Sequence, residues 1–285
     1  MLRLFDYDAA APLDFKVEAS EVRDGLTVET ISYASPKGGR VTGVMIRPPL
    51  PGRLPAVLVG HGAPGTADGA PTMAEATSVA KMGAITLAID APFSRGARRG
   101  VFAEVLHLDE RDVDDIVQLA VDWRRAVDLL ASRPDVDPSR IAYDGRSYGA
   151  AQGGLLAGLE TRIKAYALVV GDGGYYDHFT GPDAKKGPLD DLPPEQRARW
   201  LAALEPIGAS HFIGRAAPTR FLFQGGLKDE LVSVYDAKAY QGLAKRPKKI
   251  LWYDAGHQLN AQASADRHAW LAEQLGLKPA KPNGG

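Results

Sequence analysis

The chain has 285 residues, of which 45% are hydrophobic, so it can bury a sizeable core. It carries 34 lysines and arginines against 35 aspartates and glutamates, and no stretch gathers five or six like charges, which argues against nucleic acid or an anionic membrane surface as a partner. The absence of cysteine excludes a thiol nucleophile, disulfides and thiolate metal sites. Asp6 and Asp8 interrupt the start of the chain, where a secretory signal needs an apolar core, and no later segment is long enough to span a membrane. We therefore expect a soluble cytoplasmic protein.

Strands and helices are predicted to alternate along the chain. Two β-rich segments, 26–32 and 40–47, flank a Ser-Pro-Lys-Gly-Gly turn and predict an antiparallel pair. Short apolar runs follow, of the kind that forms strands buried on both faces of a parallel sheet: 56–60, 84–89, 140–144, 165–170, 219–223 and 249–253. Helical periodicity occupies the segments between them, at 72–82, 113–132, 148–159, 233–244 and 264–275. This order predicts a single α/β domain over residues 1–285, with an eight-stranded, mostly parallel sheet flanked by helices.

One long segment breaks this alternation. Residues 171–218 separate the sixth predicted strand from the seventh, and they are rich in Gly, Pro and Asp with one helical piece at 194–204. A connection of this length inside a compact domain is usually an insertion with a function, so we predict a small cap after strand 6. The Lys-, Pro- and Gly-rich tail 278–285 is expected to be frayed.

Ser147 lies in a Gly-Arg-Ser-Tyr-Gly motif at 145–149, directly between a predicted strand and a predicted helix. Glycines at both ends of the motif permit a strained strand-to-helix turn that lifts the serine hydroxyl above the sheet. The same turn places the backbone N–H of Tyr148 at a helix N-terminus, where it can stabilise an oxyanion. The alternative is a serine that merely caps the helix, but the strand and helix on either side favour a nucleophile.

A serine hydroxyl needs a base to take its proton, and His257 is the best placed of the six histidines. It follows the last predicted strand in a Tyr-Asp-Ala-Gly-His segment, from which it can reach back over the strand ends. The orienting carboxylate should follow the preceding strand, where Asp229 comes after a Gly-Gly turn. Asp172, just past the sixth strand, is an alternative acid. We favour Asp229 because the glycine turn brings its backbone close to the catalytic edge.

The glycine-rich turn after the strand at 56–60 offers a second oxyanion donor. We predict the backbone N–H of Ala63 for this role, with that of Gly62 as the alternative. His61 in the same turn is a candidate substrate-binding residue, although packing beneath the loop is the simpler interpretation.

The predicted cap supplies candidate pocket residues. Its aromatic side chains could enclose a small acyl group, or stack on a sugar or an aromatic alcohol: Tyr175, Tyr176 and Phe179. The cap lacks the broad apolar face that a lipase lid needs, which favours short acyl chains. Acidic clusters at 112–115 and 190–191 fit a helix start and the cap better than a metal site, so no metal or organic cofactor is expected. The basic loop 95–99 is interpreted as a solvated rim, with steering of anionic substrates as the alternative.

Together these motifs resemble the α/β-hydrolase superfamily. HGAPG at 61–65, GRSYG at 145–149, GGLKD at 225–229 and DAGH at 254–257 occur in this order, each at a predicted strand end. Over residues 41–277 the chain is similar to bacterial esterases related to dienelactone hydrolases, acetyl xylan esterases and the catalytic domains of prolyl-oligopeptidase-like enzymes. A dienelactone hydrolase proper would carry a cysteine nucleophile, which this chain lacks, and the segment before Ala56 leaves no room for the large propeller of the peptidases.

The resemblance implies a serine esterase that acts on small-molecule esters of short, acetyl-type acyl groups through an acyl-enzyme intermediate. A peptidase or amidase with the same triad is one alternative, and a non-catalytic binding protein with the same fold is another. The resemblance implies no cofactor, and it leaves the oligomeric state open.

Overall fold

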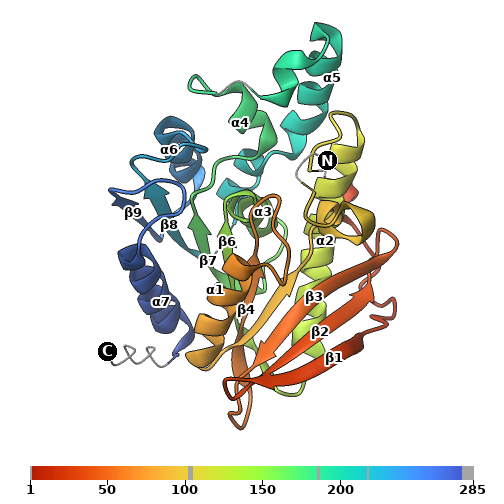
Figure 1. Ribbon diagram of the computed structural model, residues 1–285, viewed down its shortest axis with the longest axis vertical. Coiled ribbons are helices and arrows are strands. Elements are labelled where there is room, and N and C mark those ends of the chain that lie inside the picture. The colour runs from red at the N-terminus through yellow and green to blue at the C-terminus, as the bar shows by residue number, and fades with distance from the viewer. Residues whose placement is uncertain (1, 102–104, 185–186, 217, 278–285) are drawn as a thin grey trace.

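A computed structural model describes residues 2–101, 105–184, 187–216 and 218–277, so the tail predicted to fray lies outside the described residues. Within them one sheet has the strand order β1-β2-β3-β5-β4-β6-β7-β8-β9 (Figure 1). The strands are β1 (Lys16–Arg23), β2 (Leu26–Ala34), β3 (Arg40–Arg47), β4 (Leu54–Gly60), β5 (Ile85–Ile89), β6 (Val136–Arg146), β7 (Ile163–Val169), β8 (Arg220–Gly226) and β9 (Lys248–Tyr253). The helices are α1 (Ala70–Lys81), α2 (Arg111–Ser132), α3 (Tyr148–Ala157), α4 (Tyr175–Thr180), α5 (Pro194–Leu204), α6 (Val234–Leu243) and α7 (Ala261–Leu275). None of the helices in the described ranges has the length and apolar character that crossing a membrane requires.

The sheet is mostly parallel, as predicted. Strands β5, β4, β6, β7, β8 and β9 pair in parallel, whereas β1, β2 and β3 form an antiparallel edge, which confirms the pair expected at 26–32 and 40–47. The predicted number of eight strands is wrong, because β1 adds a ninth in the described residues. Every residue of β1 is exposed. A strand without a buried face has no need of apolar residues, so β1 lacks the apolar run that identifies a buried strand in the sequence.

Helices cover both faces of the sheet, and the side chains of β4 show how the core is divided. Ala56 and Leu58 belong to a hydrophobic cluster shared with α2 and α3, whereas Val57 and Val59 belong to a second cluster shared with α1 and α7. Successive side chains of a strand point to opposite faces, so a strand buried on both faces must be apolar throughout. This explains the continuous apolar runs that predicted the central strands.

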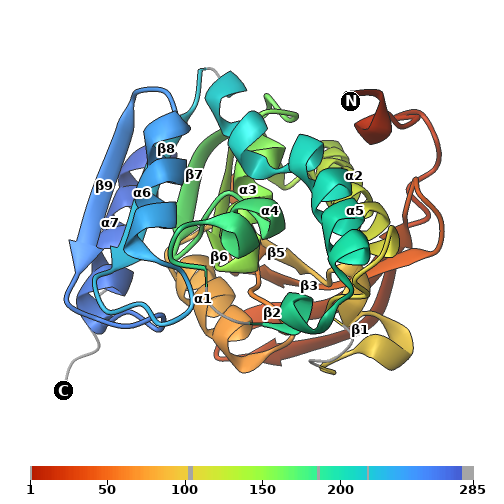
Figure 2. The same ribbon diagram turned by 90° about the horizontal axis from the view of Figure 1, so that it is seen from above.

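The segment predicted as a cap, 171–218, contains α4 and α5, which lie over the carboxyl ends of the parallel strands (Figures 1 and 2). Only α5 was expected from the sequence, because α4 is a six-residue helix and too short to show a helical period. The indole N–H of Trp200 in α5 donates to the Asp112 carboxylate at the start of α2, over 2.7 Å. The same carboxylate accepts the amides of His107 and Leu108. The Asp112 side chain therefore fastens the cap to the helix layer.

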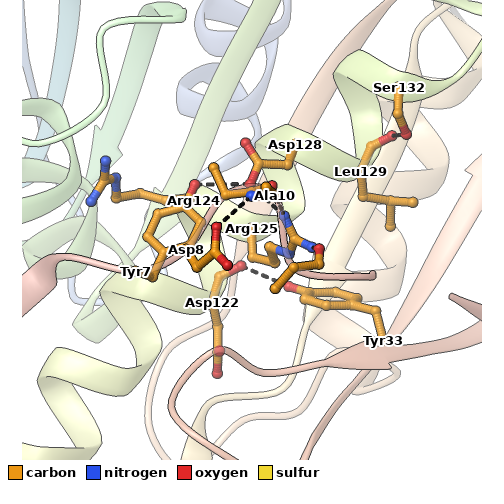
Figure 3. Close-up of polar contacts among 12 residues, drawn as sticks. Tyr7, Asp8, Ala10, Tyr33, Asp122, Arg124, Arg125, Asp128, Leu129 and Ser132 are labelled. Atoms are coloured by element: carbon orange, nitrogen blue, oxygen red, sulfur yellow. Dashed lines mark hydrogen bonds and ion pairs between the residues drawn. The ribbon is translucent and has the colours of Figure 1, made fainter. Parts of the chain in front are cut away.

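The N-terminal segment is attached along α2 by polar contacts (Figure 3). The buried guanidinium of Arg125 donates to the carbonyl oxygens of Ala9 and Ala11 and to the Asp128 carboxylate. The hydroxyl of Tyr7 also donates to Asp128, over 2.9 Å. Ala9 and Ala11 lie outside helices and strands, so their carbonyl oxygens accept hydrogen bonds from a side chain instead. These bonds hold a segment with little secondary structure against α2.

Candidate active site

Ser147 occupies a tight turn between β6 and α3. Its backbone has φ of 54° and ψ of −121°, a conformation that is rare for residues other than glycine. The Ser147 amide donates to the carbonyl oxygen of Val169 on β7, over 2.8 Å, which holds the turn against the neighbouring strand. A Cβ atom on Gly149 would lie 2.5 Å from the carbonyl oxygen of Gly60, so the second glycine of the motif permits a close approach of backbones. The strained turn places Ser147 at the carboxyl edge of the sheet.

His257 lies between Ser147 and Asp229. Its Nε2 atom is 3.0 Å from the Ser147 Oγ, and its Nδ1 atom is 2.9 Å from both carboxylate oxygens of Asp229. The Asp229 Oδ1 atom also accepts the amides of Leu231 and Val232, each over 2.9 Å. Burial opposes ionisation of Asp229, but the hydrogen bonds from His257 and the two amides outweigh it and lower the pKa of the carboxyl group.

The contacts of His257 determine which ring nitrogen can act as a base. An ionised carboxylate only accepts hydrogen bonds, so Asp229 favours the tautomer that carries its proton on Nδ1. Nε2 is then free to accept the proton of the Ser147 hydroxyl. Of the three side chains singled out from the sequence, His257 is thus within hydrogen-bond distance of both Ser147 and Asp229, in a geometry suited to nucleophilic catalysis.

Asp172, the alternative acid, is engaged elsewhere. Its Oδ2 atom lies 2.7 Å from Nδ1 of His178 in α4, and its Oδ1 atom accepts the amide of Gly174 over 3.0 Å. We call Asp172 and His178 the cap pair. His178 lies in the segment predicted as a cap, and the only signal for this pair in the sequence is an aspartate six residues before a histidine at the exit of a predicted strand.

The turn after β4 and the start of α3 carry the two backbone amides predicted as oxyanion donors. A Cβ atom on Gly62 would lie 3.2 Å from the Cβ of Ser147, so this turn packs directly against the serine. The carbonyl oxygen of Gly62 accepts the Gly65 amide, a bond that closes the turn around Ala63. Tyr148 is the first residue of α3, so its amide has no partner within the helix. Both amides predicted as oxyanion donors therefore belong to segments that contact Ser147.

His61 is buried, and both of its ring nitrogens are hydrogen-bonded to backbone atoms. Its Nδ1 atom lies 2.8 Å from the carbonyl oxygen of Gly62, and its Nε2 atom accepts the amide of Ala91 over 3.1 Å. Burial lowers the pKa of the His61 ring, which favours the neutral form that these two bonds require. The geometry favours the packing interpretation over direct binding of substrate by the His61 side chain.

The cap aromatics are packed against one another. The Tyr175 ring lies 5.5 Å from the ring of Tyr148, 6.2 Å from that of Phe179 and 6.3 Å from that of Trp200, measured between centroids. Tyr175 and Tyr176 line a cavity of ≈ 20 Å³ against the first turns of α3. That volume suits a single water molecule, so the aromatic side chains themselves fill most of the pocket expected there.

The arginines of the loop 95–99 are paired with acids. Each arginine forms an ion pair with a buried or partly buried carboxylate. The distances between nitrogen and oxygen are 2.8 Å for Arg95 and Asp122, 2.7 Å for Arg98 and Asp115, and 2.7 Å for Arg99 and Asp90. The prediction of a simply solvated rim is therefore wrong, because these bonds tie the loop to α2 and to the end of β5. Neutralised arginines also argue against a role in steering anionic substrates.

Arg146, the residue before Ser147, reaches behind the turn to the histidine loop. Its guanidinium donates to the carbonyl oxygen of His257 over 2.6 Å. Burial lowers the pKa of Arg146, and the positive charge of Arg267 lowers it further. Nothing in the sequence indicates a role for Arg146, since the second position of such a motif can hold almost any residue. In the structure, Arg146 directly connects the turn that carries Ser147 with the loop that carries His257.

A buried charge cluster lies next to Arg146, between α1 and α7. The guanidinium of Arg267 pairs with Asp144 over 3.1 Å and with Glu75, and Glu75 also bonds to the His268 ring over 2.8 Å. Burial opposes ionisation of Glu75, but Arg267 and His268 outweigh it and hold its pKa well below the usual range. The cluster borders a cavity of ≈ 300 Å³ that Arg146 also lines.

No family model matches the chain, and no curated protein matches it either. Solved structures do match. An acetyl xylan esterase from Paenibacillus sp. R4 aligns with a TM-score of 0.76 and 24% identity over 96% of this chain and 92% of that one. Acetyl xylan esterase 1 from Thermoanaerobacterium sp. JW/SL YS485 aligns with a TM-score of 0.75 and 17% identity over 95% and 91%. The α/β-hydrolase GrgF from Penicillium sp. sh18 aligns with a TM-score of 0.64 and 16% identity over 87% and 99%. The chain therefore has the α/β-hydrolase fold, as its sequence motifs predicted.

Proposed function

We propose that the protein is a serine carboxylic-ester hydrolase that acts on small-molecule esters with short acyl groups. The observation that carries the proposal is the 3.0 Å contact between Ser147 Oγ and His257 Nε2. Ser147 lies on a strained turn, and the other ring nitrogen of His257 is hydrogen-bonded to Asp229. The two acetyl xylan esterases among the structural neighbours support esters as the substrate class.

In the proposed mechanism, the Ser147 oxygen attacks the ester carbonyl while His257 takes the hydroxyl proton. The amides of Tyr148 and Ala63 donate hydrogen bonds to the oxyanion that forms. His257 then gives its proton to the leaving alcohol, and later it takes a proton from the water that hydrolyses the acyl-enzyme. Asp229 keeps the proton on Nδ1 and stabilises the imidazolium.

Short acyl groups are proposed because little open space adjoins Tyr148 beneath the cap. The cavity there measures ≈ 20 Å³, and Tyr175, which lines it, is packed against the ring of Phe179. Each methylene buried on binding gains about 0.8 kcal/mol while room lasts. We therefore expect kcat/KM for p-nitrophenyl esters to be highest between acetyl and hexanoyl and to fall for longer chains. A maximum at dodecanoyl or beyond would contradict a small pocket.

The central test is Ser147→Ala, with Ser139→Ala as the control at an exposed position on β6. Removing the nucleophile of a triad lowers the rate on the order of a million-fold, so ester hydrolysis by Ser147→Ala should be almost undetectable. A fluorophosphonate probe should label Ser147 in the parent and in Ser139→Ala, and nothing in Ser147→Ala. Labelling of another serine, or activity within about tenfold of the parent, would refute the proposal.

The same assay separates the alternatives when matched anilides are included. Anilides cleaved as fast as esters would favour a peptidase or amidase with this triad. A folded parent that is neither labelled nor active on either series would favour a non-catalytic binding protein.

A further inference from the structure

We propose that His178 is a specificity residue of this site. Its ring donates a hydrogen bond from Nε2 to an uncharged oxygen of the substrate outside the scissile ester, such as an ether or a hydroxyl. Asp172 acts as its positioning residue. The inference rests on the proposed ester hydrolysis and deepens it, because it names a chemical feature by which one ester would be preferred over another.

The topology places the cap pair beside the catalytic side chains. Strand β7 lies between β6, which leads to Ser147, and β8, which leads to Asp229, and the segment that carries the pair leaves the sheet at the end of β7. A Cβ atom on Gly171 would collide with the Cβ of Ala150, so this segment packs on the first turn of α3. The cap pair therefore lies at the same sheet edge as the triad, at the end of the strand between those that lead to Ser147 and Asp229.

The contacts within the pair leave one end of the imidazole available. The Asp172 carboxylate is 7% exposed, and its second oxygen is held by the Gly174 amide, so its position is fixed. The His178 ring, by contrast, is 34% exposed and packs edge-on against Phe179, with centroids 4.9 Å apart. Nδ1 is bound to Asp172, whereas Nε2 has no hydrogen-bond partner in the described part of the chain. A buried acid thus orients a partly exposed ring with a free polar end.

The surrounding charges make that free end a donor. Burial opposes protonation of His178, but its hydrogen bond to Asp172 and the negative charges of Asp172, Asp236 and Asp229 outweigh burial and raise the pKa of the ring. These carboxylates belong to three elements: the exit of β7, the start of α6 and the loop after β8. In the imidazolium both nitrogens carry a proton, so Nδ1 donates to Asp172 and Nε2 can donate to a ligand.

The same carboxylates define the class of acceptor. Three acidic side chains around one imidazolium leave the neighbourhood negatively charged, which disfavours a substrate with its own carboxylate or phosphate. An uncharged ether or hydroxyl oxygen accepts a hydrogen bond without that repulsion. The structure therefore points to esters with additional neutral oxygens, rather than purely alkyl esters or anionic ones.

The experiment compares two acetates of equal length, heptyl acetate and 2-(2-methoxyethoxy)ethyl acetate, in which oxygens replace two methylenes. Loss of a charge-assisted hydrogen bond should lower kcat/KM of His178→Phe for the ether ester by about 10- to 100-fold, with heptyl acetate changed less than about threefold. His178→Gln keeps a neutral donor and should recover part of the preference. The control is His211→Phe, which alters an exposed cap histidine that is bound to Glu205 instead. It should leave both esters within about twofold of the parent.

The pH profile gives a readout that a purely structural role would not produce. When the His178 imidazolium is deprotonated, the proton on Nδ1 stays in place because it is hydrogen-bonded to Asp172. Nε2 therefore loses its proton and changes from a donor to an acceptor. The preference of the parent for the ether ester should therefore fall as pH rises through the raised pKa of His178, and in Asp172→Asn it should fall at lower pH. His178→Gln should show a preference that does not change with pH.

Specific outcomes would overturn the inference. Equal losses on both esters in His178→Phe, or an ether preference that this variant retains, would refute a substrate contact by His178. If the folded parent hydrolyses neither acetate, the proposed function fails and the inference falls with it. If the parent hydrolyses both without preference, only the inference fails.

Discussion

Replacing Asp229 by asparagine tests the proposed triad most sharply, because the structure indicates how the amide would sit. Oδ1 of Asp229 accepts the amides of Leu231 and Val232, so an asparagine should keep its oxygen there and turn its NH2 group toward His257. Oδ2, the position that the NH2 would take, lies 2.9 Å from Nδ1. An amide donor at that position favours the tautomer with the proton on Nε2, which cannot accept the hydroxyl proton of Ser147.

The expected loss follows from this tautomer switch. A wrong tautomer at this position can lower kcat about ten-thousand-fold, which corresponds to about 5.4 kcal/mol in the activation free energy. We expect that loss for Asp229→Asn on p-nitrophenyl acetate, with a melting temperature close to that of the parent because the two side chains are nearly isosteric. Asp172→Asn is the matched control, since its carboxylate contacts His178 instead. A loss below about 100-fold in Asp229→Asn, or an equal loss in Asp172→Asn, would refute the assignment of Asp229.

Further predictions concern the residues behind the serine turn. Arg146→Met removes the bond to the carbonyl oxygen of His257 and keeps most of the aliphatic volume, so kcat should fall by about 10- to 100-fold with KM changed little; a kcat within twofold of the parent would show that the loop is positioned without it. Glu75, whose pKa is lowered from 4.5 in the folded state, should contribute stability that is present above about pH 4.5 and lost as pH falls below it. Urea unfolding at pH 7, 5 and 4 should therefore show a steeper loss for the parent than for Glu75→Gln, and parallel losses would contradict the linkage.

The sequence predicted the parallel part of the sheet well because both of its faces are covered. A strand such as β4 sends alternate residues into two separate clusters, so each residue had to be apolar and the run was easy to find. The exposed strand β1 and the short helix α4 left no such pattern. Burial on both faces made the central parallel strands of this chain predictable.

The site residues that could be predicted are those whose position along the chain, next to a strand end, already places them at the site. Ser147 could be singled out because the strand, the glycines and the helix around it are all local in sequence. The partner of His178 and the contact of Arg146 with the histidine loop could not be found in this way. Each depends on how a loop folds back over the sheet edge, and neither has a spacing that a motif would fix.

The choice between the two candidate acids depends on which loops pack together. The loop that carries Asp229 lies against the loop that carries His257: the Lys228 amide donates to the carbonyl oxygen of Ala255 over 3.0 Å, and a Cβ atom on Gly226 would lie 2.7 Å from the carbonyl oxygen of Gly256. A side chain at position 226 would therefore push the two loops apart, and the acid would move away from Nδ1. The glycine turn brings Asp229 to the catalytic edge by letting two neighbouring loops touch. Strand β7, which lies between β6 and β8, presents Asp172 to another histidine, so two acid–histidine pairs form at one sheet edge.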